Sequence, residues 1–450
     1  MERIFCIVIN FGTELRPFFD TGLYDELNKH YKVVCFIKKN SLIKFIDCLP
    51  EKLIEIYDPS IIIKNNNEKL QLFSKLDFFL RRIRKSRIRR IGYGEYHFTK
   101  GSNFKKRLYD YIIGNEFFYT IQRFFYNKLA PWAYFSEEIH QLFLKHKITD
   151  VLYYGSNMTE MLLIQHTASA KGLNLWHYVG NWKDIYIDDF IPIQPKKIFV
   201  WSEIIKNDLV KFNPWINRKS ITISGNWFFY KFKNLKPFFS KSYFFKKYCF
   251  DEARKIILWP LSNKVIFPGE YLLLQKVNLF IKKIPENTRP IILIRENAFG
   301  SINEHQEIIS KLENIRLMEN YWLLNREDDF IFQRKEGEQE WLDILYWCDF
   351  IVTTPSTITL EAILVGKTIV NILFDETGNY SSKLAAFAAA PFYKSLLSRN
   401  DVKLVNNIND FFEMLMRPED MKLYTLQELP EIIDGNKISN LSTVLESLMQ

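Results

Sequence analysis

Short apolar segments rich in β-branched residues alternate with helix-like segments in two separate series, and this alternation restricts the fold most strongly. The first series begins with residues 4–9 and the second with residues 255–259. An aromatic, lysine-rich connection over residues 226–249 separates them. Strands that alternate with helices form parallel sheets with helices on both faces. The sequence therefore predicts an α/β protein with two Rossmann-like domains, residues 1–235 and residues 236–450, the second ending in helices.

The length of the chain agrees with two domains, because 450 residues exceed the roughly 250–300 at which a single core stops growing. In the first domain we expect one helix over residues 14–30 and a mostly helical insertion over about residues 70–147. No stretch reaches the roughly 18 apolar residues of a membrane-spanning helix. The five cysteines lack ligand or disulfide spacing, which favours a reducing compartment and no zinc site.

Positive charge is concentrated in the helical insertion. Residues 71–128 contain 14 Lys and Arg against 4 Asp and Glu, in a chain whose net charge is +9. The densest run consists of Arg81, Arg82, Arg84, Lys85, Arg87, Arg89 and Arg90. Clustered cations attract anionic lipid by about 1 kcal/mol each, and neighbouring aromatic residues can lie at headgroup level. We expect a cytoplasmic protein, peripheral on the inner face of the plasma membrane. A solvated helix face and a nucleic-acid site are the alternatives, and we do not expect nucleic acid as a partner.

The clearest candidate ligand site lies over residues 349–362. Ligands of doubly wound folds bind beyond the carboxyl ends of the strands. Here a buried strand runs into a hydroxyl-rich turn with Thr354, Ser356 and Thr357, and a helix follows. Free N–H groups at a helix start, with hydroxyls beside them, suit a phosphate. Glu361, further along the helix, can accept hydrogen bonds from a ribose. An ordinary helix capped by Ser356 or Thr357 would show the same pattern.

Residues 356–371 resemble the S-T-x-x-L-E-A-x-x-x-G-K-P-x-V motif of bacterial GT-B glycosyltransferases of surface polysaccharide biosynthesis, the capsule and O-antigen type. Residues 16–27, 176–184 and 195–227 are similar to further blocks of that family. The family's R-x-H-P reads Arg-Glu-Asn-Ala at residues 295–298, and its S-W-D appears as Asn-Trp-Lys with the acid one place later. The resemblance implies a GT-B fold, in which two Rossmann-like domains with parallel sheets face a cleft.

The resemblance also implies a site for a nucleotide-sugar donor in the second domain. The phosphates of the leaving nucleotide gain charge as the glycosidic bond breaks, so donors aimed at that charge lower the barrier. The expected donor-binding residues are Ser262, Asn263, Lys264, Arg295, Glu296, Thr354, Ser356, Thr357 and Glu361. Lys264 and Asn263 could equally belong to a plain surface turn, and Glu296 could simply pair with a cation.

An inverting transfer needs a general base for the acceptor hydroxyl, which we expect from loops of the first domain. Asp184 is the first candidate and Asp20 the second, ahead of Glu14 and His177. We expect neither a metal nor another cofactor, because cationic side chains and a helix terminus can stabilise the leaving phosphates, and the nucleotide-sugar is a co-substrate.

The function predicted from the sequence is transfer of a sugar from a nucleotide-sugar donor to a lipid-linked surface glycan, as in capsule, O-antigen or lipopolysaccharide biosynthesis. Three alternatives share the fold. These are a CDP-polyol phosphotransferase, a nucleotide-sugar epimerase, and a non-catalytic protein that binds a glycan or a partner.

Overall fold

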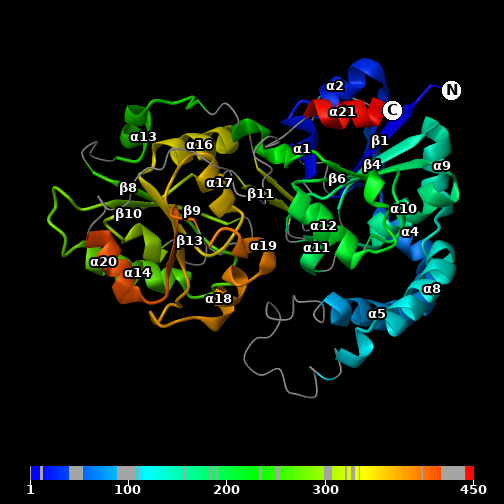
Figure 1. Cartoon of the computed structure of the whole chain (residues 1–450). Coiled ribbons are helices and arrows are strands. Elements are labelled where there is room, and N and C mark those ends of the chain that lie inside the picture. Colours follow the sequence, from blue (N-terminus) through cyan, green and yellow to red (C-terminus); the bar gives the residue numbers. More distant parts are fainter. Residues whose placement is uncertain are drawn as a thin grey trace. The chain divides into compact units, whose positions relative to one another are not determined.

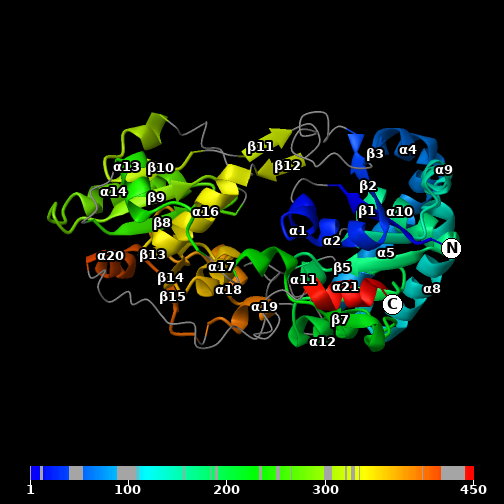
Figure 2. The same cartoon turned by 90° about the horizontal axis from the view of Figure 1, so that it is seen from above.

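A computed structural model describes most of the chain, and its described residues form two compact units. The described residues are 2–10, 14–39, 54–88, 108, 111–155, 158–182, 184–187, 191–232, 236–249, 254–264, 266–297, 307–319, 322–325, 330–333, 335–397, 399–416 and 441–449. The first unit comprises described residues of Met1–Tyr230, Asn325–Phe332 and Glu431–Gln450, and the second those of Lys231–Leu324 and Gln333–Pro430. Figure 1 and Figure 2 show the elements of both units.

The first unit contains a seven-stranded sheet in the order β3-β2-β1-β4-β5-β6-β7. All of its strand pairs are parallel. The strands are β1 (Ile4–Ile9), β2 (Lys32–Lys38), β3 (Ile54–Tyr57), β4 (Asp150–Tyr154), β5 (Asn174–Tyr178), β6 (Lys197–Val200) and β7 (Ile221–Ile223). The central strand β1 is buried along its whole length, as expected for a parallel sheet covered on both faces.

Helices connect and cover these strands. They are α1 (Leu15–Phe19), α2 (Leu23–His30), α4 (Pro59–Asn65), α5 (Asn67–Ile88), α8 (Glu116–Ala133), α9 (Glu137–His146), α10 (Thr159–Ala170), α11 (Asp184–Ile187) and α12 (Glu203–Phe212), with the 3-10 helices η4 (Arg218–Ser220) and η5 (Trp227–Phe232). The single helix expected over residues 14–30 is wrong. Gly22 adopts a φ of 77°, which a helix interior does not allow, so the chain turns there and a second helix begins.

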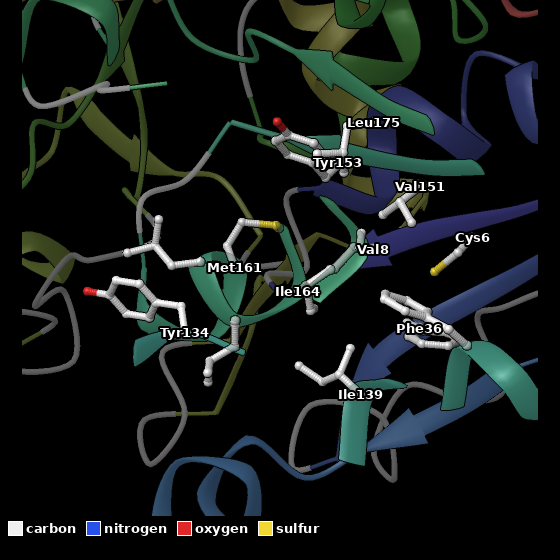
Figure 3. Close-up of a cluster of buried hydrophobic side chains, with 14 of the residues drawn as sticks. Cys6, Val8, Phe36, Tyr134, Ile139, Val151, Tyr153, Met161, Ile164 and Leu175 are labelled. Atoms are coloured by element: carbon white, nitrogen blue, oxygen red, sulfur yellow. The ribbon is translucent and has the colours of Figure 1, made fainter. Parts of the chain in front are cut away.

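One buried cluster of the first unit lies between its sheet and the helices α4, α5, α8, α9 and α10. Val8 and Phe36 from the sheet, Ile139 from α9 and Met161 from α10 belong to one buried cluster (Figure 3). Burying each such side chain contributes about 1.5–3 kcal/mol. In the predicted insertion, α5, α8 and α9 follow one another along the chain, and all three send side chains into this cluster. The insertion is therefore mostly helical over its described residues and is part of the core of the unit.

The second unit contains a six-stranded parallel sheet in the order β10-β9-β8-β13-β14-β15. Its strands are β8 (Ile256–Pro260), β9 (Ile291–Arg295), β10 (Ile315–Leu317), β13 (Phe350–Thr353), β14 (Ile369–Ile372) and β15 (Val402–Val405). Its helices are α13 (Lys241–Lys247), α14 (Glu270–Ile281), α16 (Lys335–Trp347), α17 (Ile358–Leu364), α18 (Ser382–Ala388), α19 (Pro391–Lys394) and α20 (Ile408–Met416). Two further strands, β11 (Trp322–Asn325) and β12 (Phe330–Gln333), pair with each other. The predicted second α/β series is confirmed.

The C-terminal helix α21 (Leu441–Met449) belongs to the first unit, which differs from the expected boundary of the second domain. Figure 1 shows this helix, in red, beside α2, and the two are in contact. Val444 and Leu448 are fully buried, and the carbonyl oxygen of Leu448 accepts a hydrogen bond from the Arg3 guanidinium at 2.6 Å. The apolar side of α21 is therefore buried against the N-terminal part of the first unit.

Candidate functional site

The carboxyl ends of β8 and β13 bring together two loops that lie far apart in the sequence. These strands are neighbours in the second sheet and run parallel. The hydroxyl oxygens of Ser262, after β8, and Thr354, after β13, are 2.7 Å apart and share a hydrogen bond. Because parallel strands end at the same sheet edge, the two predicted donor-binding loops form one surface.

A second group of contacts in the same unit connects three side chains, Arg295, Trp341 and Glu361. The guanidinium carbon of Arg295, at the end of β9, lies 4.1 Å from the centroid of the Trp341 ring. The indole Nε1 of Trp341 donates to Oε2 of Glu361 at 2.7 Å. Trp341 therefore contacts both a cation and a carboxylate, and a partly exposed cation over an indole gains about 0.5–1 kcal/mol. Sequence reasoning missed Trp341, because a tryptophan in an amphipathic helix is most often simply core.

The hydroxyl groups of Ser356 and Thr357 do not cap the helix that follows them. Thr357 occupies the N-cap position of α17 without a side-chain hydrogen bond. Its φ and ψ of −60° and −25° are helical, whereas a capping residue is usually extended. The Ser356 hydroxyl is buried and has no hydrogen-bond partner among the described residues. A buried hydroxyl without a partner is costly, which favours a ligand or water at this position.

Glu270, the first residue of α14, holds the loop after β8 in place through hydrogen bonds. Its carboxylate accepts from the indole Nε1 of Trp259 at 2.9 Å and from the backbone N–H of Ser262 at 2.6 Å. Burial raises the pKa of Glu270 to about 7, and the hydrogen bonds from Trp259 and Ser262 oppose this shift. The sequence contains only a weak signal for this residue, since an acid in the first turn of a helix is common.

The other predicted donor-binding residues also lie at the carboxyl edge of the second sheet. Asn263 is half-buried in the turn after β8, and its carbonyl accepts from the backbone N–H groups of Ile266 and Phe267. Lys264 is exposed in the same turn, and Glu296 is half-buried directly after β9. Eight of the nine predicted donor-binding residues thus lie at or just after the carboxyl ends of β8, β9 and β13, and Glu361 lies within α17. The binding role of each residue stays a prediction.

The lysine of the resembling motif has a structural partner. The ammonium of Lys367 is buried and donates to the carbonyl oxygen of Cys348 at 2.8 Å. This bond joins the end of α17 to the start of β13. Lys367 therefore stabilises the scaffold behind the site.

The predicted general bases occupy loops of the first unit. Asp184 is half-buried and begins α11, after the end of β5. Asp20 is exposed in the turn between α1 and α2. Glu14 is buried, and its Oε2 accepts a hydrogen bond from the backbone N–H of Asn10 at 2.6 Å. Asp184 and Asp20 remain predictions for the base.

His177 is buried within the sheet of the first unit. It is 3% exposed and stacks on Tyr153, with ring centroids 4.8 Å apart. Burial lowers the pKa of His177 to about 3, so the imidazole is neutral at physiological pH. Neither ring nitrogen has a hydrogen-bond partner among the described residues.

Aromatic stacking closes the carboxyl ends of β5 and β7 in the first unit. The rings of Tyr178 and Trp227 are stacked with centroids 3.9 Å apart. The Tyr178 hydroxyl donates to Oδ1 of Asn226 at 3.0 Å and accepts from the backbone N–H of Trp227 at 2.9 Å. At Gly180, an added Cβ would lie only 1.7 Å from an atom of the Tyr154 ring. This edge is therefore closely packed.

The arginine run of α5 lies partly inside the protein, which corrects the prediction that Arg84 and Arg87 bind a membrane surface. Arg84 and Arg87 are buried, and Arg87 pairs with Glu116 while lying over the Tyr119 ring. Arg81 pairs with Asp77 at 2.6 Å. Asp77 lies on α5 itself, whereas helix periodicity turns Arg84 and Arg87 towards α8, where Arg84 lies over the Tyr126 ring.

Of the remaining residues in that run, Arg82 is exposed. Lys85 lies in α5, and Arg89 and Arg90 lie outside the described residues. None of the described helices combines the length and apolarity that crossing a bilayer requires. The described residues also contain no cluster of His, Cys, Asp and Glu suited to a metal ion.

Comparison with known proteins supports the fold. No family model matches the chain, and no curated protein is similar to it in sequence. Among solved structures, it is similar to the UDP-GlcNAc 2-epimerase of Methanocaldococcus jannaschii, with a TM-score of 0.55 and 14% identity over 100% of both chains. S. aureus MnaA in a co-structure with UDP aligns with a TM-score of 0.55 and 13% identity, over 100% of this chain and 96% of that one.

A third structure, the UDP-GlcNAc 2-epimerase of Neisseria meningitidis bound to UDP-GlcNAc, aligns with a TM-score of 0.51 and 14% identity over 100% of both chains. The chain has a GT-B-like fold. Both parallel sheets and the full length of the chain take part in these alignments, so the GT-B-like architecture extends over both units. At 13–14% identity, these similarities establish the fold of the chain and not its reaction.

Proposed function

We propose that this GT-B-like protein is a nucleotide-sugar-dependent enzyme whose second unit binds the nucleotide diphosphate. One observation supports this most strongly: hydroxyls from two loops and Arg295, which lies over Trp341, are found at the carboxyl ends of the neighbouring strands β9, β8 and β13. The solved structures of similar fold include one with UDP and one with UDP-GlcNAc. A diphosphate needs hydrogen-bond donors and a cation, and this edge contains both.

In the proposed chemistry, the residues of the second unit stabilise the departing nucleotide. Arg295 and the hydroxyls of Ser356 and Thr354 face the charge that develops on the phosphate oxygens. Glu361 accepts hydrogen bonds from the ribose, and Trp341 keeps its carboxylate in place. We propose transfer of the sugar to a lipid-linked glycan acceptor, with Asp184 or Asp20 as the base that takes the proton of the acceptor hydroxyl.

A nucleotide-sugar epimerase is the second candidate, and the comparisons favour it over glycosyl transfer. The three structures described above comprise two named as UDP-GlcNAc 2-epimerases and one that holds UDP. An epimerase needs the same nucleotide site but no acceptor. A CDP-polyol phosphotransferase would instead accept a cytidine nucleotide. A non-catalytic binding protein would show no turnover.

Nucleotide binding tests the proposal directly. The thermal stability of the purified chain is measured with UDP, GDP, CDP, CMP and dTDP. A ligand that binds the folded state at a hundredfold excess over its Kd adds about 2.7 kcal/mol. A shift with one nucleotide identifies the donor class, and the absence of any shift contradicts the proposal.

Product analysis then separates the two reactions. The chain is incubated with the sugar form of the nucleotide that binds, without an acceptor, and the sugar is examined by NMR. Inversion at a sugar carbon in the intact nucleotide-sugar identifies an epimerase. Release of nucleotide only after a lipid-linked glycan is added identifies a transferase.

A further inference from the structure

The helix α8 is apolar on the side that faces the core and also on the side that faces solvent. Tyr119 and Tyr126 are buried on its inner face. The outer face carries Phe117, Phe124, Phe125 and Trp132, with exposed fractions of 67%, 54%, 44% and 47%. A helix in a water-soluble protein normally turns its apolar side to a partner. The outer face of α8 therefore has the composition of a contact surface.

The neighbouring helix α5 repeats this arrangement. Its inner face contributes Phe73 and Leu80 to the core cluster. Its outer face exposes Leu72, Phe78 and Phe79, the first two by about 70%. Figure 1 and Figure 2 show α5 and α8 side by side, in contact with each other. Because both helices turn their inner faces to one core, their outer faces point away from it together.

A close approach holds the two helices as a pair. Gly114, just before α8, lies so near to α5 that an added Cβ would be 2.5 Å from the carbonyl oxygen of Ser86. The ion pair of Arg87 with Glu116 joins the same ends of the helices. The outer surface is therefore a fixed part of the fold.

Cations lie in the middle of both outer faces. Lys75 and Arg82 are exposed on α5 at positions that helical spacing places between the exposed apolar residues. Lys128 is exposed on α8, with its ammonium 4.8 Å from the Phe124 ring centroid. The acids Asp77 and Glu116 are held in ion pairs with arginines, and Glu68 lies at the start of α5.

We propose that the outer faces of α5 and α8 form a docking surface for an anionic lipid bilayer. Aromatic side chains beside lysine and arginine match the boundary between acyl chains and anionic headgroups. The occupant follows from charge complementarity: exposed cations surrounded by aromatic rings suit a negatively charged, apolar surface. The purpose of docking, access to a lipid-linked acceptor, rests on the proposed function, whereas the binding itself does not.

The residues of this docking surface differ from the arginine run of α5. The arginines Arg84 and Arg87 are buried and act within the helix pair. The membrane-contacting residues are instead the exposed aromatic residues of α8 together with Lys75, Arg82 and Lys128. Aromatic insertion makes binding less dependent on salt than a purely basic patch.

Vesicle co-sedimentation tests the proposal with the full-length chain. Phosphatidylcholine vesicles are compared with vesicles that also contain phosphatidylglycerol. We expect binding to the anionic vesicles, weakened at least about tenfold by the double variant Phe124→Ser with Trp132→Ser. Lys75→Glu with Lys128→Glu should weaken binding to anionic vesicles selectively. Phe238→Ser, 74% exposed in the second unit, is the matched control and should bind normally.

Light scattering and the nucleotide-induced thermal shift are measured on the same samples. Unchanged nucleotide shifts in the variants show that the fold is intact, so loss of vesicle binding supports the proposal even if catalysis is never detected. Vesicle binding that the α8 variant retains, or no binding by the native chain, overturns it. A native dimer that the α8 variant converts to a monomer also overturns it, because the face then binds a second copy.

Discussion

The carboxyl ends of the two parallel sheets carry different side chains, although the same alternation of strands and helices builds both. In the second unit this edge contains the hydroxyls of Ser262 and Thr354 and the Arg295 side chain. The indole ring of Trp341 contacts Arg295 and donates a hydrogen bond to Glu361. In the first unit, Tyr178 and Trp227 stack on each other and close the edge. Polar groups suit a charged ligand, whereas stacked rings contribute mainly stability. Substitution of the stacked rings should therefore mainly lower stability, whereas substitution of Arg295 should mainly weaken nucleotide binding.

The largest effect is expected from Trp227→Ala in the first unit. Trp227 is fully buried against Tyr178, so its removal leaves a cavity and should lower the free energy of unfolding by about 3–5 kcal/mol. Urea denaturation followed by circular dichroism measures this loss. Trp132→Ala, at an exposed tryptophan, is the control and should change stability little. Equal losses in both variants would contradict the contrast between a buried and an exposed ring.

Glu270 lies beside the polar edge of the second sheet, but its ionisation should change the stability of the fold. Its pKa is about 7 in the folded chain and near 4.5 in the unfolded one, so the folded state holds more protons between these values. Stability should then fall by about 3 kcal/mol as the pH rises from about 4.5 to 7. Glu270→Gln should remove this slope in denaturation curves at several pH values.

The control for this pH dependence is Glu307→Gln, at an exposed carboxylate paired with Lys311. Its slope should equal that of the native chain. A native stability curve that rises over the same window would show that burial does not dominate the Glu270 carboxyl.

Tyr178→Phe should have a smaller effect at the first edge. The substitution keeps the ring but removes the hydroxyl that accepts from the Trp227 N–H and donates to Asn226. A buried N–H without this partner costs about 1–3 kcal/mol. The expected result is a lower urea midpoint with an unchanged nucleotide-induced thermal shift, and Tyr380→Phe, at an exposed tyrosine, should match the native chain.

Arg295→Met should change nucleotide binding and leave stability nearly as it is. Loss of a charged hydrogen-bond donor should weaken the Kd for the nucleotide by about tenfold, measured by isothermal titration calorimetry. Arg316→Met on the neighbouring strand β10 is the matched control, since Arg316 bonds to backbone carbonyls of Glu313 and Ile315. Equal affinities in both variants would remove Arg295 from the proposed site.

The local pattern of the sequence predicted the two α/β series well. Strand periodicity, apolar runs and glycines act over a few residues, so β1, β8 and β13 lie where the sequence places them. The hydroxyl-rich turn after β13 was also readable, because the end of a parallel strand is recognisable from its neighbours. The break of the first helix at Gly22 was missed, since only the φ of 77° distinguishes a turn glycine from a tolerated one.

Contacts between distant residues were decided only by the tertiary structure. Trp341 joins Arg295 to Glu361 because α16 packs beside these residues, and nothing near Trp341 in the sequence indicates it. The same holds for Arg84 and Arg87. The sequence indicates an exposed basic run, whereas packing against α8 buries both side chains. Local periodicity determines which face a side chain occupies. What lies opposite that face, and hence its burial, charge state and partners, depends on segments remote in the chain.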